Sequence, residues 1–153
     1  MTEDKRLEIV ALLRKAFNME LETVCNYTAQ SINLDGFKAK HIKDALAADI
    51  TEELTHAQMI AKRIKVLEGV VPGSQSLEMN QSALQPNGDA LDIVSVIHGV
   101  IAAEDSAIQH YQSIIDAAGD DDPVTEDLCI QLKGDEEEHR RLFKGFLAEA
   151  MQG

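Results

Sequence analysis

The stretch LAADITEELTHAQMIAKRIKVL, residues 46–67, has apolar residues recurring every three or four positions. This spacing predicts a long amphipathic helix whose apolar face packs in a core. The same face carries Asp49, Glu53 and His56, polar side chains that a buried helix face seldom holds. A buried charge is costly unless it is paired or bound to a metal ion. The stretch therefore predicts a helical fold with a polar site inside its core.

Three other segments repeat this spacing, so the sequence predicts an all-α chain with four long helices. Gly36, Gly69 and Gly119 follow the first three segments as stop signals, and Asp122 before Pro123 is a good N-cap for the fourth. The predicted helices span about Glu3–Asn33, Lys38–Glu68, Ala90–Ala118 and Pro123–Ala150.

The connections between the predicted helices differ in length. Those near Gly36 and Gly119 are short and imply two antiparallel hairpins. The middle connection, from Val70 to about Asn87, is long enough to cross over along the bundle, and a short helix is predicted within it at Leu77–Leu84. No linker divides the chain, so we expect residues 1–153 to form a single four-helix-bundle domain.

The composition excludes several classes of function. The 27 acidic and 14 basic residues give a net charge of −13, which disfavours a nucleic-acid partner and attracts cations. No apolar run reaches the roughly 18 residues of a membrane span. The charged N-terminus lacks the apolar part of a signal peptide, so we expect a cytoplasmic protein. Cys25 and Cys129 are accordingly expected to be free thiols.

Each predicted helix carries a glutamate near the middle of its apolar face. Two of these glutamates are followed three positions later by a histidine, a spacing that puts both side chains on one helix face. The two hairpins repeat the pattern: glutamate on the first helix, then Glu-x-x-His on the second, with nearly equal separations. The residues concerned are Glu20, Glu53 and His56 in the first half, and Glu104, Glu136 and His139 in the second.

Folding the two hairpins together predicts a cluster of four carboxylates and two imidazoles. Four negative charges match two divalent cations, and oxygen with imidazole ligands suits iron or manganese better than thiophilic metals. A single Glu-x-x-His is common on solvated helix surfaces, and the acidic run 135–138 is compatible with such a surface. The doubled pattern with two further glutamates favours a two-metal site.

These motifs resemble the ferritin-like di-iron carboxylate superfamily, and most closely bacterioferritin. The similar segments are residues 18–27, 53–69 and 135–139. The resemblance implies a ferritin-like four-helix bundle with two Fe ions per chain, manganese being the alternative. By the same resemblance Glu53 and Glu136 would bridge the irons. The pairs Glu20 with His56 and Glu104 with His139 would then complete the two ends.

Tyr27 lies one heptad after Glu20 on the same face. The resemblance implies that its phenol donates an electron or a proton during oxygen reduction, which makes Tyr27 the predicted catalytic residue. The alternative is a core tyrosine whose hydroxyl is satisfied by a hydrogen bond. Tyr111, one heptad after Glu104, has the same two interpretations.

Three positions depart from the bacterioferritin pattern. Leu54 stands where that family has its haem-binding methionine, so haem is not expected. Ala48 and Glu52 replace the histidine and aspartate of the family's inner-surface iron site. Asp49, one turn before Glu53, either helps to pass iron inward or faces the edge of the bundle.

The assembly stays open at this stage between a dimer, a 12-subunit cage and a 24-subunit cage. Few residues follow His139, whereas a bacterioferritin has a further short helix that lines channels of its 24-subunit shell. The long middle connection resembles twelve-subunit Dps-type cages, of which those with a bacterioferritin-type site are the credible relatives. If the first and fourth helices run parallel, Cys25 and Cys129 lie about 18 Å apart, too far for a disulfide.

The leading functional hypothesis is a ferroxidase that oxidises Fe(II) with dioxygen or hydrogen peroxide and stores the iron in a homo-oligomeric cage. A second hypothesis is a di-metal enzyme without storage, similar to rubrerythrin peroxidases or manganese catalases, although no rubredoxin-type cysteine pairs supply an electron donor. The third is a helical module without metal. The oxidant and the native metal stay open.

Overall fold

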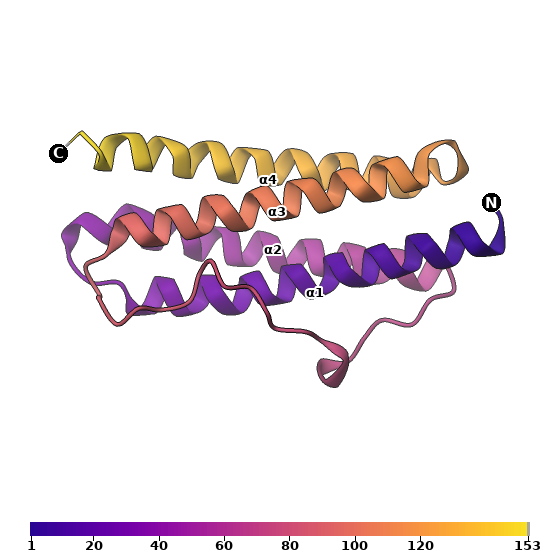
Figure 1. Ribbon diagram of the computed structural model, residues 1–153, viewed down its shortest axis with the longest axis horizontal. Coiled ribbons are helices and arrows are strands. Elements are labelled where there is room, and N and C mark those ends of the chain that lie inside the picture. Colours follow the sequence, from indigo (N-terminus) through magenta and orange to yellow (C-terminus); the bar gives the residue numbers. More distant parts are fainter. Residues whose placement is uncertain (153) are drawn as a thin grey trace.

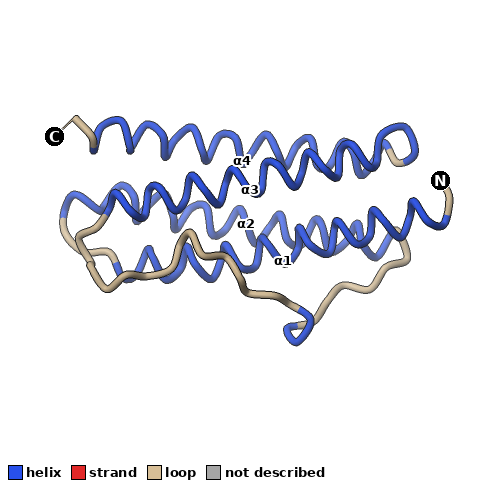
Figure 2. The backbone as a smooth tube through the Cα atoms, viewed as in Figure 1, coloured by secondary structure: helices blue, strands red, loops and turns tan. Residues whose placement is uncertain are grey.

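Four long helices occur in the predicted order, which confirms the all-α bundle (Figure 1). The computed structural model describes residues 1–152, and Figure 2 shows helices and loops without a strand in that part of the chain. Three short 3-10 turns lie between the helices, at Phe37–Ala39, Ser74–Ser76 and Gly119–Asp121. The helices are α1 (Glu3–Asn33), α2 (Lys40–Val66), α3 (Ile93–Ala118) and α4 (Pro123–Ala150).

The helices form two antiparallel hairpins, as the short connections predict. The helices α1 and α2 pack along each other, as do α3 and α4, and the hairpins meet mainly through α1 against α3. In Figure 1 both α1 and α4 run from right to left, so these two helices are parallel. Cys25 and Cys129 are free, as expected.

The start of α4 confirms the predicted cap. The backbone N–H of Thr125 donates to Asp122 Oδ1 over 3.1 Å, and Pro123 occupies the first turn. Arg63 from the end of α2 donates to the same Asp122 oxygen over 2.7 Å. One aspartate therefore caps α4 and ties it to α2. The third helix begins later than predicted, at Ile93, because Asp92 caps it by accepting from the backbone N–H of Ser95.

Two apolar clusters fill the bundle, one toward each end. One includes Leu13, Ile60 and Leu132, and the other includes Leu46, Ile97 and Phe143; all six are fully buried. The six predicted metal ligands fall between these clusters in the sequence of every helix. Burial of the apolar side chains on both sides, at about 25 cal/mol per Å², holds a polar layer that would not be stable alone.

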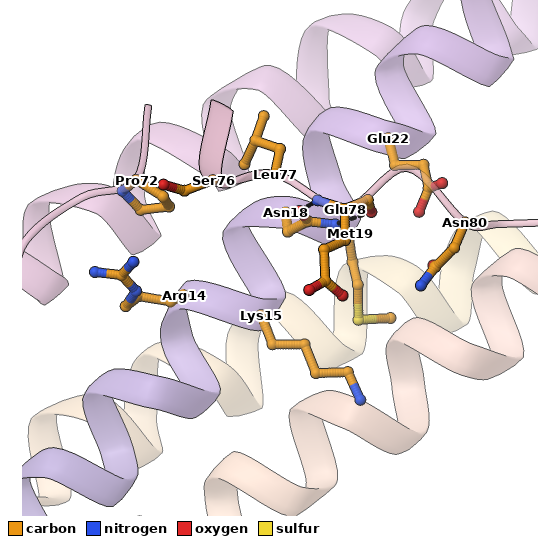
Figure 3. Close-up of a pocket in the computed structure, with 10 residues that line it drawn as sticks. All are labelled: Arg14, Lys15, Asn18, Met19, Glu22, Pro72, Ser76, Leu77, Glu78 and Asn80. Carbon is orange, nitrogen blue, oxygen red and sulfur yellow. Dashed lines mark hydrogen bonds between the residues drawn. The ribbon is translucent and has the colours of Figure 1, made fainter. Parts of the chain in front are cut away.

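The middle connection, here called the crossover (residues 67–92), corrects one prediction. No helix forms at Leu77–Leu84, and the segment runs extended along the outside of α1. Its backbone bonds to outward-facing side chains of α1 instead, so helical hydrogen bonds are not needed. Asn18 accepts from Glu78 N–H and donates to its carbonyl, and Figure 3 shows the two residues side by side.

The contact between α1 and the crossover continues up the helix at steps of four residues. Glu22 accepts the backbone N–H of Gln81 over 2.6 Å, and Gln30 donates to the Leu84 carbonyl over 2.8 Å. The Leu84 side chain is fully buried in the core. The crossover is thus fastened to the bundle by a polar stripe and one apolar anchor.

The remaining histidines lie on the surface or pack against the backbone. His41 and His98 are exposed, and His110 is buried with Nε2 2.8 Å from the Leu12 carbonyl. Among the described residues, no helix combines the length and apolarity that a membrane crossing requires.

Candidate metal centre

The bundle brings all six predicted ligands together from four helices. Each of them is at most 5% exposed. Their donor atoms form two groups, and within each group all donor atoms lie within 4.8 Å of one another. Glu53 and Glu136 belong to both groups. The first group adds Glu20 and His56, and the second adds Glu104 and His139. This sharing has the geometry in which two central carboxylates lie between two positions for ions.

Several donor atoms of the cluster have no hydrogen-bond partner in residues 1–152. They include one carboxylate oxygen of each of the four glutamates and Nδ1 of both histidines. Short distances do occur, such as 2.9 Å between His56 Nδ1 and Glu136 Oε1, but without hydrogen-bond orientation. Buried polar atoms normally have partners, so unpaired atoms converging on one place indicate room for cations between them.

Outer carboxylates orient both imidazoles. His56 Nε2 lies 3.0 Å from Asp135 Oδ2, and His139 Nε2 lies 2.7 Å from Glu52 Oε2. Each Nδ1 therefore faces the cluster while each Nε2 is held from outside, the usual arrangement for a metal-binding histidine. Sequence reasoning missed this role of Glu52 and Asp135. The signal was present, because an acidic residue directly precedes each central glutamate.

Asp49 lies beside the cluster and not at an exposed edge of the bundle. It is 6% exposed, and its Oδ1 is 3.4 Å from His139 Nε2. Burial raises the pKa of Asp49 to about 7; nearby Glu104 and Glu52 add to the rise, and His139 opposes it. Asp49 therefore supports the outer side of His139.

The two tyrosines are buried and their hydroxyls cross between hairpins. Tyr27 on α1 donates to Glu104 Oε1 on α3 over 2.5 Å, and Tyr111 on α3 donates to Glu20 Oε1 on α1. Each tyrosine thus contacts the glutamate of the other helix. Burial raises the pKa of both phenols well above 10, and the nearby carboxylates add to this rise. Both hydroxyls are therefore protonated donors at neutral pH.

Without metal ions the cluster holds protons. Burial raises the pKa of Glu104 to about 8, and the neighbouring carboxylate of Glu136 adds to the rise although His139 opposes it. Burial lowers the pKa of His56, but Glu136 and Glu53 outweigh it and bring the value to about 10. The same carboxylate contacts raise the pKa of His139. Cations would replace these protons as the neutralising charge.

Comparison with known families agrees with this geometry. The sequence profile of the ferritin-like domain matches residues 10–151, nearly the whole chain. The chain belongs to the ferritin-like family. No curated protein matches its sequence significantly.

Solved structures show how widely this ferritin-like fold is shared. A ferritin-like diiron-carboxylate protein from Bacillus anthracis has a TM-score of 0.84 at 18% identity, covering 96% of this chain and 99% of that one. The dodecameric thioferritin of Bacteroides fragilis has a TM-score of 0.84 at 24% identity, covering 96% of this chain and 88% of that one. The Desulfovibrio desulfuricans bacterioferritin, described with a diiron site, has a TM-score of 0.82 at 21% identity, covering 98% of this chain and 84% of that one. Likenesses at this identity establish the ferritin-like fold.

Proposed function

We propose that the six-residue cluster binds two metal ions, iron in the first place, with manganese as the alternative. Glu53 and Glu136 would lie between the ions. Glu20 with His56 would complete one end, and Glu104 with His139 the other. The single observation that carries the proposal is the convergence of unpaired, buried donor atoms from all six side chains.

The donor set fits such ions. It contains carboxylate oxygens and imidazole nitrogens but no thiolate, and this mixture favours iron or manganese over thiophilic metals. Four carboxylates balance two divalent charges, which removes the cost of burying the carboxylates alone. Haem is not proposed, because Leu54 has no atom that could coordinate it.

The reaction we propose is ferroxidation with Fe(II) as substrate. Two Fe(II) ions each give up one electron; with two protons these reduce dioxygen to hydrogen peroxide, or hydrogen peroxide to two water molecules. The hydroxyl oxygen of Tyr27 lies 2.5 Å from Glu104 Oε1, so the phenol proton can be passed to the centre. The apolar clusters at both ends limit the access of water to the reacting ions.

Iron storage in a homo-oligomer is the wider form of the proposal. Large apolar side chains at the α1–α2 turn and beside it are strongly exposed: Ile32 is 73%, Phe37 88% and Leu91 70% exposed. Leu91 lies next to this turn, with Gly36 close to its Cδ2. Exposed apolar groups of this kind often mark subunit contacts. The thioferritin relative is described as dodecameric; a 12-subunit cage of this 16.8 kDa chain would have a mass of about 200 kDa.

The experiment that tests the site measures bound metal per chain in matched variants. Glu53→Gln and Glu136→Gln should each weaken the binding of both ions, because each carboxylate belongs to both groups. Glu20→Gln should weaken the binding of mainly one ion and leave about one bound ion per chain. Glu137→Gln, an exposed neighbour on α4, is the control and should keep two.

Two results would overturn the proposal. The first is a wild-type protein that takes up no Fe(II), Mn(II) or Co(II) at neutral pH. The second is full metal binding by Glu53→Gln and Glu136→Gln alike. Consumption of Fe(II) and oxygen by the loaded protein, followed by light scattering from ferric mineral, then separates ferroxidation with storage from metal binding alone.

A further inference from the structure

A narrow recess opens to the metal centre between α1 and α3. The four glutamates of the cluster line it. Met19 and Thr23 of α1 form one wall, and Ala103 and Ala107 of α3 form the other. The alanines leave space beside Glu104 that larger side chains would fill. The last residue to line the recess is Gln81, which comes from the crossover and not from a helix.

Two buried residues of α1 hold Gln81 at this position. Its backbone N–H donates to Glu22 Oε2 over 2.6 Å, and its side-chain Oε1 accepts from Asn26 Nδ2 over 2.7 Å. Glu22 and Asn26 are 6% and 8% exposed, and both contacts with Gln81 are partly buried. The carboxamide of Gln81 is therefore placed at the recess by specific hydrogen bonds.

The space inside the recess is too small for a hydrated ion. It accommodates roughly one water molecule, so some lining side chain must move before a metal ion reaches the glutamates. The helical walls are fixed by their backbone hydrogen bonds, whereas Gln81 lies on an extended segment. Its carboxamide is held by one neutral hydrogen bond, which opens easily.

The recess lies next to the groove shown in Figure 3. Met19 lines both the groove and the recess, and Glu22, which holds Gln81, lines the groove as well. The groove is open and is bordered by Glu78 of the crossover, but also by two basic side chains, Arg14 and Lys15.

The opposite face of the centre is less suited to ion passage. There Glu52 and Asp135 are partly exposed, but they contact the outer nitrogens of His139 and His56. An ion arriving on that side would have both imidazoles between itself and the glutamates. The α1–α3 side has no ligand in the way except the glutamates themselves.

We propose that Gln81 is the gate of the metal centre: its side chain, held by Asn26, closes the recess and swings aside to admit metal ions. This inference rests on the proposed function, since a gate has meaning only if ions bind at the centre. Gln81 touches no reacting atom and is a positioning residue that controls the rate of uptake.

The test follows Co²⁺ uptake by the metal-free full chain in a stopped-flow spectrometer. Gln81→Ala should speed uptake about 2- to 10-fold, the factor associated with one neutral hydrogen bond, and should keep two ions per chain. Gln75→Ala is the matched control, because Gln75 is an exposed glutamine of the same crossover that does not line the recess. Its uptake rate should equal that of the wild type.

A second variant tests the same hydrogen bond in case the first variant does not fold. Asn26→Ala leaves Gln81 in place but removes its side-chain partner, so it should also speed uptake; circular dichroism would verify the fold of each variant. Unchanged uptake in both folded variants, with two ions bound, would overturn the gate and leave the metal site intact. Absence of Co²⁺ binding in the wild type would refute the metal site and the gate together.

Discussion

The crossover passes so close to α3 that a side chain at position 99 forces it to move. A Cβ atom on Gly99 would lie 2.5 Å from the Ala83 carbonyl oxygen and 2.8 Å from Leu84 Cδ2. The first contact is with backbone, so no side-chain rotation relieves it, and Gly99→Ala must push the crossover outward. The resulting strain costs about 1–3 kcal/mol.

Two other effects enter the balance for Gly99→Ala. An alanine in a helix interior gains about 1 kcal/mol over glycine. Displacement of the crossover weakens the hydrogen bond from Gln30 to the Leu84 carbonyl, which costs about 1 kcal/mol. We therefore expect a net loss of about 1–3 kcal/mol in the free energy of unfolding.

Urea unfolding followed by circular dichroism at one fixed protein concentration measures this loss. Gly145→Ala in α4 is the matched control, because no atom lies within 4 Å of its added Cβ. It should be stabilised by up to about 1 kcal/mol through helix propensity alone. The change in the free energy of unfolding should therefore have opposite signs in the two variants. Stabilisation of Gly99→Ala to the same extent as Gly145→Ala would refute the close packing of crossover and α3.

Three further predictions concern the capped helix, the protons and the tyrosine. Asp122→Ala removes the α4 cap and the partner of Arg63, so urea unfolding should show a loss of about 1–3 kcal/mol. Burial raises the pKa of Asp122, but the hydrogen bonds in the first turn of α4 and Arg63 lower it overall. The wild type should therefore lose stability more steeply than Asp122→Ala as the pH falls below about 4. Co²⁺ binding at pH 7 should release protons, since the pKa values of His56 and Glu104 are about 10 and about 8 without metal. Calorimetry in two buffers of different ionisation enthalpy measures this release, and equal heats would contradict it. Tyr27→Phe should keep both ions but slow Fe(II) oxidation on the order of 100-fold; an unaltered rate would leave the tyrosine as a core residue only.

Much of the fold could be predicted from local patterns. The helix bounds of α1 and α4 and the cap at Asp122 follow from periodicity and capping chemistry, which act within a few residues. The crossover could not be predicted in this way. Its apparent helix at Leu77–Leu84 gives way because α1 offers Asn18, Glu22 and Gln30 as partners for an extended backbone. Those partners are more than fifty residues away in the sequence.

The sequence by itself determined the four glutamates and two histidines of the centre, because the spacing along each helix decides which side chains share a face. Only the tertiary structure decided which side chains surround them. Tyr27 bonds to Glu104 and Glu52 to His139 across the hairpins, and Gln81 reaches the centre from the crossover. These contacts depend on how the hairpins dock and where the crossover lies, and no spacing within one helix contains that information.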